Sequence, residues 1–404
     1  MAPADVTTPA VFSFGGNARE RIGFLGLSCA LAAFTLCTLD GGPVAPLMIS
    51  AALLLFAGCY FGLYSTARPV SVSVPAICVS LMVLYGVVQT MFLRQKILYD
   101  GWTAVIFWSA AAAITWLGAH LFVDFRAAAA FRLVLILFAS AMCVLDLLEQ
   151  ASSADKYYWL IPSRYNTVFG PFAYWNNFAQ FVELALPVTL WAGLSRRKPV
   201  IKYLLLGALQ IAAVVASGSR AGTALVGIEL LAVILLAFRH NRNRSLLFGA
   251  ALAISLSTVF IYSAGIDRLM GKLEQNDQLA VRRNINRTSI AIIRERPITG
   301  WGLNTYVPVY RMFALYDDGT YVNRAHNDWL QFLAEGGILF TGPMIFLFLW
   351  SIRPAIQSVW GIGLIAVGVH ALVDYPFARL GVCGWYFALI AMLPGKRFRK
   401  GAAF

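Results

Sequence analysis

Charged residues are scarce in this sequence. Only 13% of its 404 residues are Asp, Glu, Lys or Arg, whereas 59% are hydrophobic. Because a soluble protein carries about 25% charged residues, this composition excludes an ordinary soluble protein and indicates one that crosses a membrane repeatedly. In a membrane protein, the placement of the Lys and Arg residues that give the net charge of +13 reports first on membrane topology, and need not indicate a binding partner. The chain has no soluble basic domain, which argues against a nucleic-acid partner.

Residue patterns that hold metals and nucleotides are scarce too. The six cysteines lie in apolar segments without C-x-x-C spacing, which is typical of small packing residues rather than of zinc sites or disulfides. No Asp-x-Asp pair is placed to hold a metal ion with a nucleotide sugar. The run 300–302 (Gly-Trp-Gly) follows a proline rather than a strand, so it is not a nucleotide-binding glycine loop. The sequence therefore predicts neither a metal site nor a cofactor.

Long hydrophobic runs, by contrast, recur along the whole chain. A transmembrane helix needs about 20 apolar residues, and twelve runs approach this length. They cover roughly residues 22–39, 44–63, 74–93, 103–122, 131–148, 176–195, 201–217, 221–238, 246–264, 329–350, 356–375 and 380–395. We therefore predict an all-α, polytopic membrane protein with about 12 transmembrane helices, in which residues 1–404 form a single integral membrane domain.

Basic residues are concentrated in every second connection between these runs. This bias predicts that those connections and both termini are cytoplasmic. The long outer loop 265–328 is the exception, because it is also rich in arginine. Long loops cross a membrane regardless of charge. The loop is therefore either a solvated segment with internal ion pairs or a basic surface for an anionic substrate or lipid headgroup.

Within this loop, residues 279–296 predict a helix that is ended by Pro297. At about 100° per residue, Arg283 and Arg287 share one face of this helix, whereas Arg282 points elsewhere. The loop therefore places its arginines in two different directions.

The stretch 324–328 (Arg-Ala-His-Asn-Asp) closes the loop and opens a hydrophobic helix. Asn327 is a candidate N-cap for that helix. Asp328, Gln331 and Glu335 follow at positions i, i+3 and i+7 and therefore share one helical face. A polar stripe on an apolar helix costs free energy unless something polar faces it. Neighbouring helices satisfy this stripe, or it faces a polar substrate.

Two other outer positions stand out. Arg220 joins two apolar runs almost without a loop, so it is either a functional charge at the membrane surface or an arginine that reaches the lipid headgroups. The segment 169–178 combines a Gly-Pro turn with aromatic residues, and Asn177, Gln180 and Glu183 then give the next helix a polar stripe. The alternative for this segment is an aromatic belt with hydrogen bonds between helices.

Other polar residues lie within apolar runs. His370 and Asp374 are one helical turn apart and are expected to pair, and Glu229 lies in the middle of a run. We interpret these groups as structural. A series of intramembrane carboxylates is also typical of proton-coupled transporters, but the internal repeats common in transporters are not detectable here.

Four of these segments resemble the O-antigen ligase/polymerase family of bacterial polysaccharide assembly. Residues 170–179 are similar to the family's G-x-F-x-x-x-N-x-x-A pattern, and residues 219–222 match its S-R-x-G pattern. Residues 282–302 resemble its Arg…P-x-x-G-x-G segment, and residues 326–337 match its H-N-x-x-L-x-x-x-x-E-x-G signature. The chain departs from the family at Ala221 and Asn286, where the family often has Gly and Trp, and neither change removes a proposed functional group.

The resemblance implies a membrane-embedded, all-helical and metal-independent glycosyltransferase in the bacterial inner membrane. Such enzymes take a glycan from undecaprenyl diphosphate at the periplasmic face, where the loop 265–328 would lie. They transfer it to a hydroxyl of lipid A-core, as a ligase, or of a second carrier-linked glycan, as a polymerase. The expected partners are therefore these glycans and membrane lipids. The alternatives are a lipid-linked oligosaccharide flippase or transporter and a non-catalytic scaffold.

The resemblance also assigns residues. Arg220 and Arg282 would hold the diphosphate, because fixed arginines stabilise the charge that grows on it as it leaves. His326 would either position or deprotonate the acceptor hydroxyl, or bind the diphosphate as a cation. Seven further residues are expected to bind substrate: Asn177, Arg164, Arg283, Arg287, Arg324, Asn327 and Glu335.

Overall fold

The computed structural model describes ten stretches of the chain and is almost entirely helical within them. These stretches are residues 18–37, 44–64, 72–92, 98–153, 156–163, 168–196, 198–240, 244–274, 278–314 and 321–393. The strands found there are β1 (Lys156–Tyr157) and β2 (Ile161–Pro162), which form one short antiparallel pair. The all-α prediction is therefore confirmed. Both termini and Arg164 lie outside the described residues.

Each of the twelve predicted runs falls on a helix. The seven helices that are long and apolar enough to cross a membrane, among the described residues, are α2 (Val44–Tyr64), α3 (Val74–Phe92), α4 (Leu98–Leu121), α5 (Phe125–Ser152), α8 (Arg220–His240), α9 (Arg244–Ala264) and α13 (Asp328–Ala355). The other five are α1 (Ala18–Leu36), α6 (Trp175–Leu194), α7 (Ile201–Ser217), α14 (Val359–His370) and α15 (Leu380–Ile390). A polytopic membrane protein is confirmed, and the number of about twelve spans stays a prediction.

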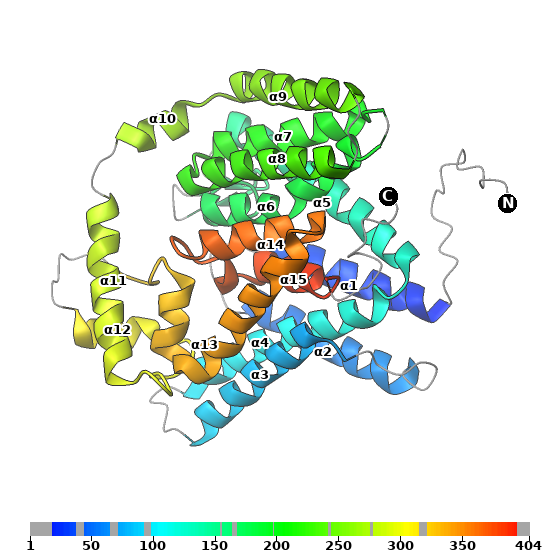
Figure 1. Ribbon diagram of the computed structural model, residues 1–404. Coiled ribbons are helices and arrows are strands. Elements are labelled where there is room, and N and C mark those ends of the chain that lie inside the picture. The colour runs from blue at the N-terminus through cyan, green and yellow to red at the C-terminus, as the bar shows by residue number, and fades with distance from the viewer. Residues whose placement is uncertain are drawn as a thin grey trace.

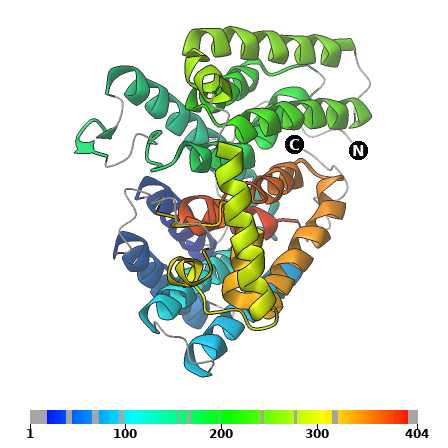
Figure 2. The ribbon, with the colours of Figure 1, turned by 90° about the vertical axis from the view of Figure 1, so that its left-hand side faces the viewer.

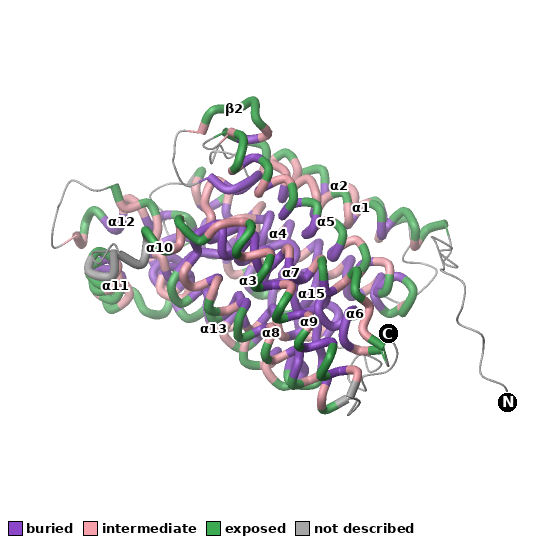
Figure 3. The backbone as a smooth tube through the Cα atoms, turned by 90° about the horizontal axis from the view of Figure 1, so that it is seen from above, coloured by how far each residue is buried: buried purple, intermediate pink, exposed green. Residues whose placement is uncertain are grey.

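The helices lie side by side (Figures 1 and 3), and α6 is surrounded by other helices. Every residue of α6 from Asn176 to Leu194 is buried, because α5, α7, α8, α14 and α15 all contact this helix. Large apolar side chains on the outer helices are exposed instead, such as Leu55 on α2 and Phe248 on α9. An exposed apolar surface of this kind suits lipid rather than water. The contacts that surround α6 explain how the bundle accommodates a helix whose first turns are polar.

The described part of the predicted outer loop contains three helices. They are α10 (Asp267–Glu274), α11 (Gln278–Glu295) and α12 (Tyr306–Phe313). Figure 1 shows them at one end of the helix bundle, opposite the start of α1, and Figure 2 shows that α11 runs across this end. The helix predicted at 279–296 is confirmed, and it ends just before Pro297.

The turn 297–302 is attached to α13 at a kink. The backbone N–H groups of Ile338 and Gly302 donate to the carbonyl oxygens of Pro297 and Glu335, at 2.9 and 2.8 Å. Gly337 has a φ of +62° at the kink, and a Cβ there would overlap the carbonyl oxygen of Ile298. The glycine-containing patterns at residues 282–302 and 326–337 are therefore joined by one backbone contact. This contact fixes the position of α11 against α13.

We expect Gly337→Ala to destabilise the protein by about 2 to 4 kcal/mol, because it adds both a backbone clash and a strained φ. The change should appear as a lower midpoint of thermal unfolding of the purified protein in detergent. Gly342→Ala is the matched control in the same helix, since a Cβ there meets nothing closer than 4.0 Å. Equal midpoints for the two variants would contradict the role of the kink.

Candidate functional site

Segments from four parts of the chain meet at a small cavity of about 40 Å³, at the same end of the bundle as α11. Its polar lining residues are Tyr174, Asn176, Arg220, Arg282, His370 and Asp374. The predicted catalytic arginines, which lie 62 positions apart, therefore face one space. This volume is too small for a glycan, so only a small group of a substrate would enter it.

Arg220 is placed by the junction between α7 and α8. Gly218 ends α7 with a φ of +75°, a left-handed conformation that glycine adopts without strain. The Ser219 hydroxyl then accepts a hydrogen bond from the Gly222 N–H at 3.2 Å and caps α8. Arg220 is thus the first residue of α8, where the helix dipole also favours an anion.

Arg282 is placed by the buried face of α11. Ile285 and Ser289 on this face are buried, and the Ser289 hydroxyl lies 2.7 Å from the hydroxyl of Tyr306. Arg282 is half-buried on the same side, whereas Arg283 and Arg287 are exposed on the other. The predicted division of the arginines is therefore confirmed, and only Arg282 of the three lines the cavity.

Asp374 is the negative charge of the cavity. Its carboxylate accepts hydrogen bonds from the Asn176 amide and, at 2.9 Å, from the Tyr375 N–H. In this turn after α14, burial by itself would raise the pKa of the Asp374 carboxyl, but His326, His370 and Arg282 outweigh burial and hold this pKa below its usual range. Asp374 is therefore a carboxylate when the cavity is empty.

Tyr174 links the two charges. Burial raises the pKa of its hydroxyl well above the usual value, and Asp374 raises it further, although a hydrogen bond with Arg282 works in the opposite direction. The Tyr174 hydroxyl also accepts a hydrogen bond from the Asn176 amide at 3.1 Å. Tyr174 is therefore a neutral hydrogen-bonding group that positions Arg282.

His326 lies beside this cavity rather than in its lining. Its Nδ1 is 3.9 Å from Oδ1 of Asp374, which is within ion-pair range but too long for a hydrogen bond. The ring contacts the edge of Tyr375, with a centroid distance of 5.2 Å, and Tyr375 stacks on Tyr174 at 5.6 Å. One quarter of the His326 side chain is exposed, so the imidazole is accessible to a substrate.

The turn that holds His326 is built by its neighbours. His326 has a φ of +50°, which non-glycine residues rarely adopt. Asn327 accepts a hydrogen bond from the Leu330 N–H at 3.1 Å and thereby caps α13, as predicted. The predicted substrate ligand Asn327 therefore has a structural role in this structure, namely to begin the helix directly after His326.

The polar stripe of α13 is satisfied by the protein itself. The Asp328 carboxylate accepts from the Phe377 N–H at 2.8 Å. Glu335 accepts from the N–H groups of Asn304 and Tyr306, at 2.9 and 3.3 Å, and from the Gln331 amide at 3.0 Å. Of the two interpretations of this stripe, the structure supports satisfaction by neighbouring segments, and Glu335 holds the start of α12.

Two residues differ from expectation, one in its partner and one in its place at the cavity. His370 does not pair with Asp374; its Nδ1 lies 2.7 Å from Oε1 of Glu183 on α6. The predicted Asn177 is buried and its amide donates to Gln180 at 2.8 Å, whereas the preceding Asn176 lines the cavity. The G-x-F-x-x-x-N pattern already placed its asparagine at 176, so this signal was present in the sequence.

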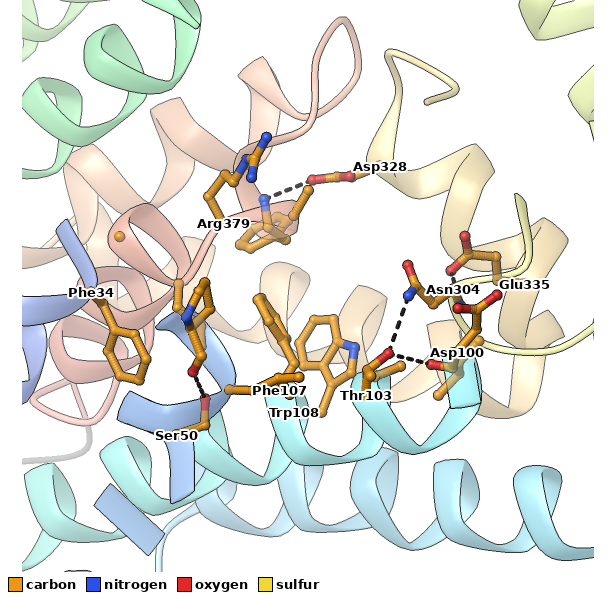
Figure 4. Close-up of a pocket in the computed structure, with 18 of the residues that line it drawn as sticks. Phe34, Ser50, Asp100, Thr103, Phe107, Trp108, Asn304, Asp328, Glu335 and Arg379 are labelled. Carbon is orange, nitrogen blue, oxygen red and sulfur yellow. Dashed lines mark hydrogen bonds between the residues drawn. The ribbon is translucent and has the colours of Figure 1, made fainter. Parts of the chain in front are cut away.

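Arg324 belongs to a second, larger cavity of about 330 Å³. Figure 4 shows its polar end at Asp100, Thr103 and Asn304 and its apolar part at Phe34, Phe107 and Trp108. The two cavities are adjacent, because Asp328 lines the larger one and its N–H donates at 3.2 Å to the carbonyl oxygen of Asp374, which lines the smaller. The site therefore has a small anion-sized space beside a larger amphipathic one.

One comparison with known proteins gives a family. Residues 205–342 match the family model described as O-antigen ligase. The matched segment contains Arg220, Arg282 and His326, while Asn176 and Asp374 lie outside it. No curated protein matches the chain. The resemblance predicted from the sequence is confirmed.

Proposed function

We propose, from the match of residues 205–342 to the O-antigen ligase family model, that this protein transfers a glycan from a lipid diphosphate to an acceptor hydroxyl. The donor would be carried on undecaprenyl diphosphate, at the periplasmic face of the bacterial inner membrane. The observation that carries the proposal is the convergence of Arg220 and Arg282 on one cavity next to His326. As an O-antigen ligase, the protein would use lipid A-core as its acceptor.

The donor's diphosphate is assigned to the small cavity. Arg220 and Arg282 each offer a planar, permanently charged guanidinium group, and Arg220 stands at the start of α8, where the helix dipole favours an anion. These donors are in place before the reaction, on side chains that are half-buried. They therefore stabilise the negative charge that grows on the diphosphate in the transition state. No residue of this assignment requires a metal ion.

His326 is assigned to the acceptor. In the proposed step, the acceptor oxygen forms a bond to the anomeric carbon and the bond from that carbon to the diphosphate oxygen breaks, with its electron pair leaving on the diphosphate. The acceptor proton passes to Nε2 of His326. Asp374, on the Nδ1 side of the ring, would orient the imidazole and stabilise the imidazolium. Of the two roles considered for His326, this arrangement supports the base.

The test is transfer by the purified protein. The reaction would contain undecaprenyl diphosphate glycan and, separately, lipid A-core or a second portion of the same donor. Glycan on lipid A-core indicates a ligase, and longer carrier-linked chains indicate a polymerase that acts on O-antigen or exopolysaccharide units. If neither product forms, while the protein in vesicles moves lipid-linked oligosaccharide across the bilayer, the proposal is wrong and transport replaces it.

A further inference from the structure

We propose that His370, held by Glu183, is a third ligand of the diphosphate and takes up a proton when the diphosphate binds. This inference rests on the proposed function and assigns a positioning and binding role to residues that lie outside the matched family segment. Among the lining residues that the structure describes, His370 is the one histidine.

The first observation is an orphaned nitrogen. His370 is 1% exposed and lines the cavity of Arg220 and Arg282. Its Nδ1 is occupied by Glu183 at 2.7 Å, while its Nε2 is buried without a hydrogen-bond partner among the residues that the structure describes. Buried polar atoms are nearly always paired. An unpaired nitrogen on a residue that lines a cationic cavity therefore indicates a ligand that supplies the missing partner.

The second observation is that the imidazole is rigidly placed. Gly363 lies two helical turns before His370 on α14, and a Cβ at Gly363 would overlap the carbonyl oxygen of Glu183. The backbones of α14 and α6 therefore touch, which fixes the distance between His370 and Glu183. The bond to Glu183 thus holds the imidazole at a fixed place in the lining of the cavity.

The third observation is the charge around the pair. The titratable and charged groups near His370 are Glu183 on α6, Glu229 on α8, Asp374 after α14, Arg220 at the start of α8, Arg282 on α11 and Tyr174 before α6. One oxygen of Glu183 and both oxygens of Glu229 have no hydrogen-bond partner within the described stretches. Glu183 and Asp374 thus offset Arg220 and Arg282, and a diphosphate diester adds two negative charges. A proton on the His370–Glu183 pair reduces this excess.

These observations define the binding event. The coupled pair takes up one proton from water, and the diphosphate holds that proton on the imidazole. Nδ1–H then donates to Glu183, and Nε2–H donates to a phosphate oxygen. A hydrogen bond between an imidazolium and a phosphate is charge-assisted and is among the strong ones. Binding of the donor therefore weakens as pH rises, because proton uptake becomes more costly.

The experiment measures binding to the full-length protein in nanodiscs. The probe is a short-chain prenyl diphosphate ester of N-acetylglucosamine, whose charge is constant while histidine titrates. Calorimetry in buffers of different ionisation enthalpy should report uptake of about one proton per bound probe by the wild type. For His370→Gln we expect no uptake and, at acidic pH, affinity weakened by about tenfold or more. Glu183→Gln should bind at acidic pH but lose affinity at lower pH than the wild type.

His120→Gln is the matched control. His120 lies in the last turn of α4, where its ring contacts the rings of Tyr60 and Phe61. It should retain the proton uptake of the wild type. Thermal unfolding of each variant shows whether it is folded. The inference is overturned if folded His370→Gln keeps the proton uptake, and loss of uptake in His326→Gln would then assign it to His326. If the wild type does not bind the probe at any pH, the proposed function itself fails.

Discussion

Arg220→Ala and Arg282→Ala are each expected to lower the rate of glycan transfer by about a hundredfold or more. Both side chains line the cavity that we assign to the leaving diphosphate, and alanine leaves the growing charge without a fixed donor. The measurement is the initial rate with purified donor and acceptor, at saturating and at low donor. Thermal unfolding of each variant shows whether it is folded.

Arg283→Ala is the control for Arg282→Ala. It removes the same charge from the neighbouring position of α11, but its side chain is exposed and does not line the cavity. We expect its rate to stay within about twofold of the wild type, as is usual for exposed positions away from a site. Equal losses in the two variants would show that α11 acts through its overall charge, and the assigned cavity would then be wrong. Arg282→Lys should recover little of the transfer rate that is lost in Arg282→Ala, because lysine cannot reproduce the planar guanidinium.

His326→Ala is expected to lower the turnover number by about a hundredfold to ten-thousandfold, which is the range for loss of a general base. The effect should fall on turnover rather than on the donor KM, because His326 lies outside the lining of the anion cavity. Asp374→Asn should cause a smaller loss, since asparagine can still accept from the Tyr375 N–H but cannot stabilise an imidazolium.

His326→Arg separates the two roles considered for this residue. Arginine is a permanent cation and a poor base, so a base role predicts that this variant is as inactive as His326→Ala. Activity that returns with arginine would instead assign His326 to the diphosphate. Thermal unfolding is needed as a companion measurement, because the φ of +50° at His326 makes the turn sensitive to substitution.

Several features were predictable from the sequence because they depend on neighbours in the chain. Hydrophobic runs long enough to span a bilayer predicted the helices. The N-cap at Asn327 follows from local backbone chemistry. The division between Arg282 and Arg283 follows from helical periodicity alone. The order of short patterns from Arg220 to Gly337 was enough to indicate the family later matched over residues 205–342.

The tertiary structure decided which distant groups meet. Asp374 lies beside His326 and Asn176, while His370 reaches Glu183, 187 positions away, and no local spacing encodes such a contact. The same limit applies to the stripe of α13. The sequence by itself determined that Glu335 faces inward with Asp328, but only the packing of the turn 302–306 supplied the backbone N–H groups that satisfy it. Burial makes pairing obligatory, and the fold selects the partner.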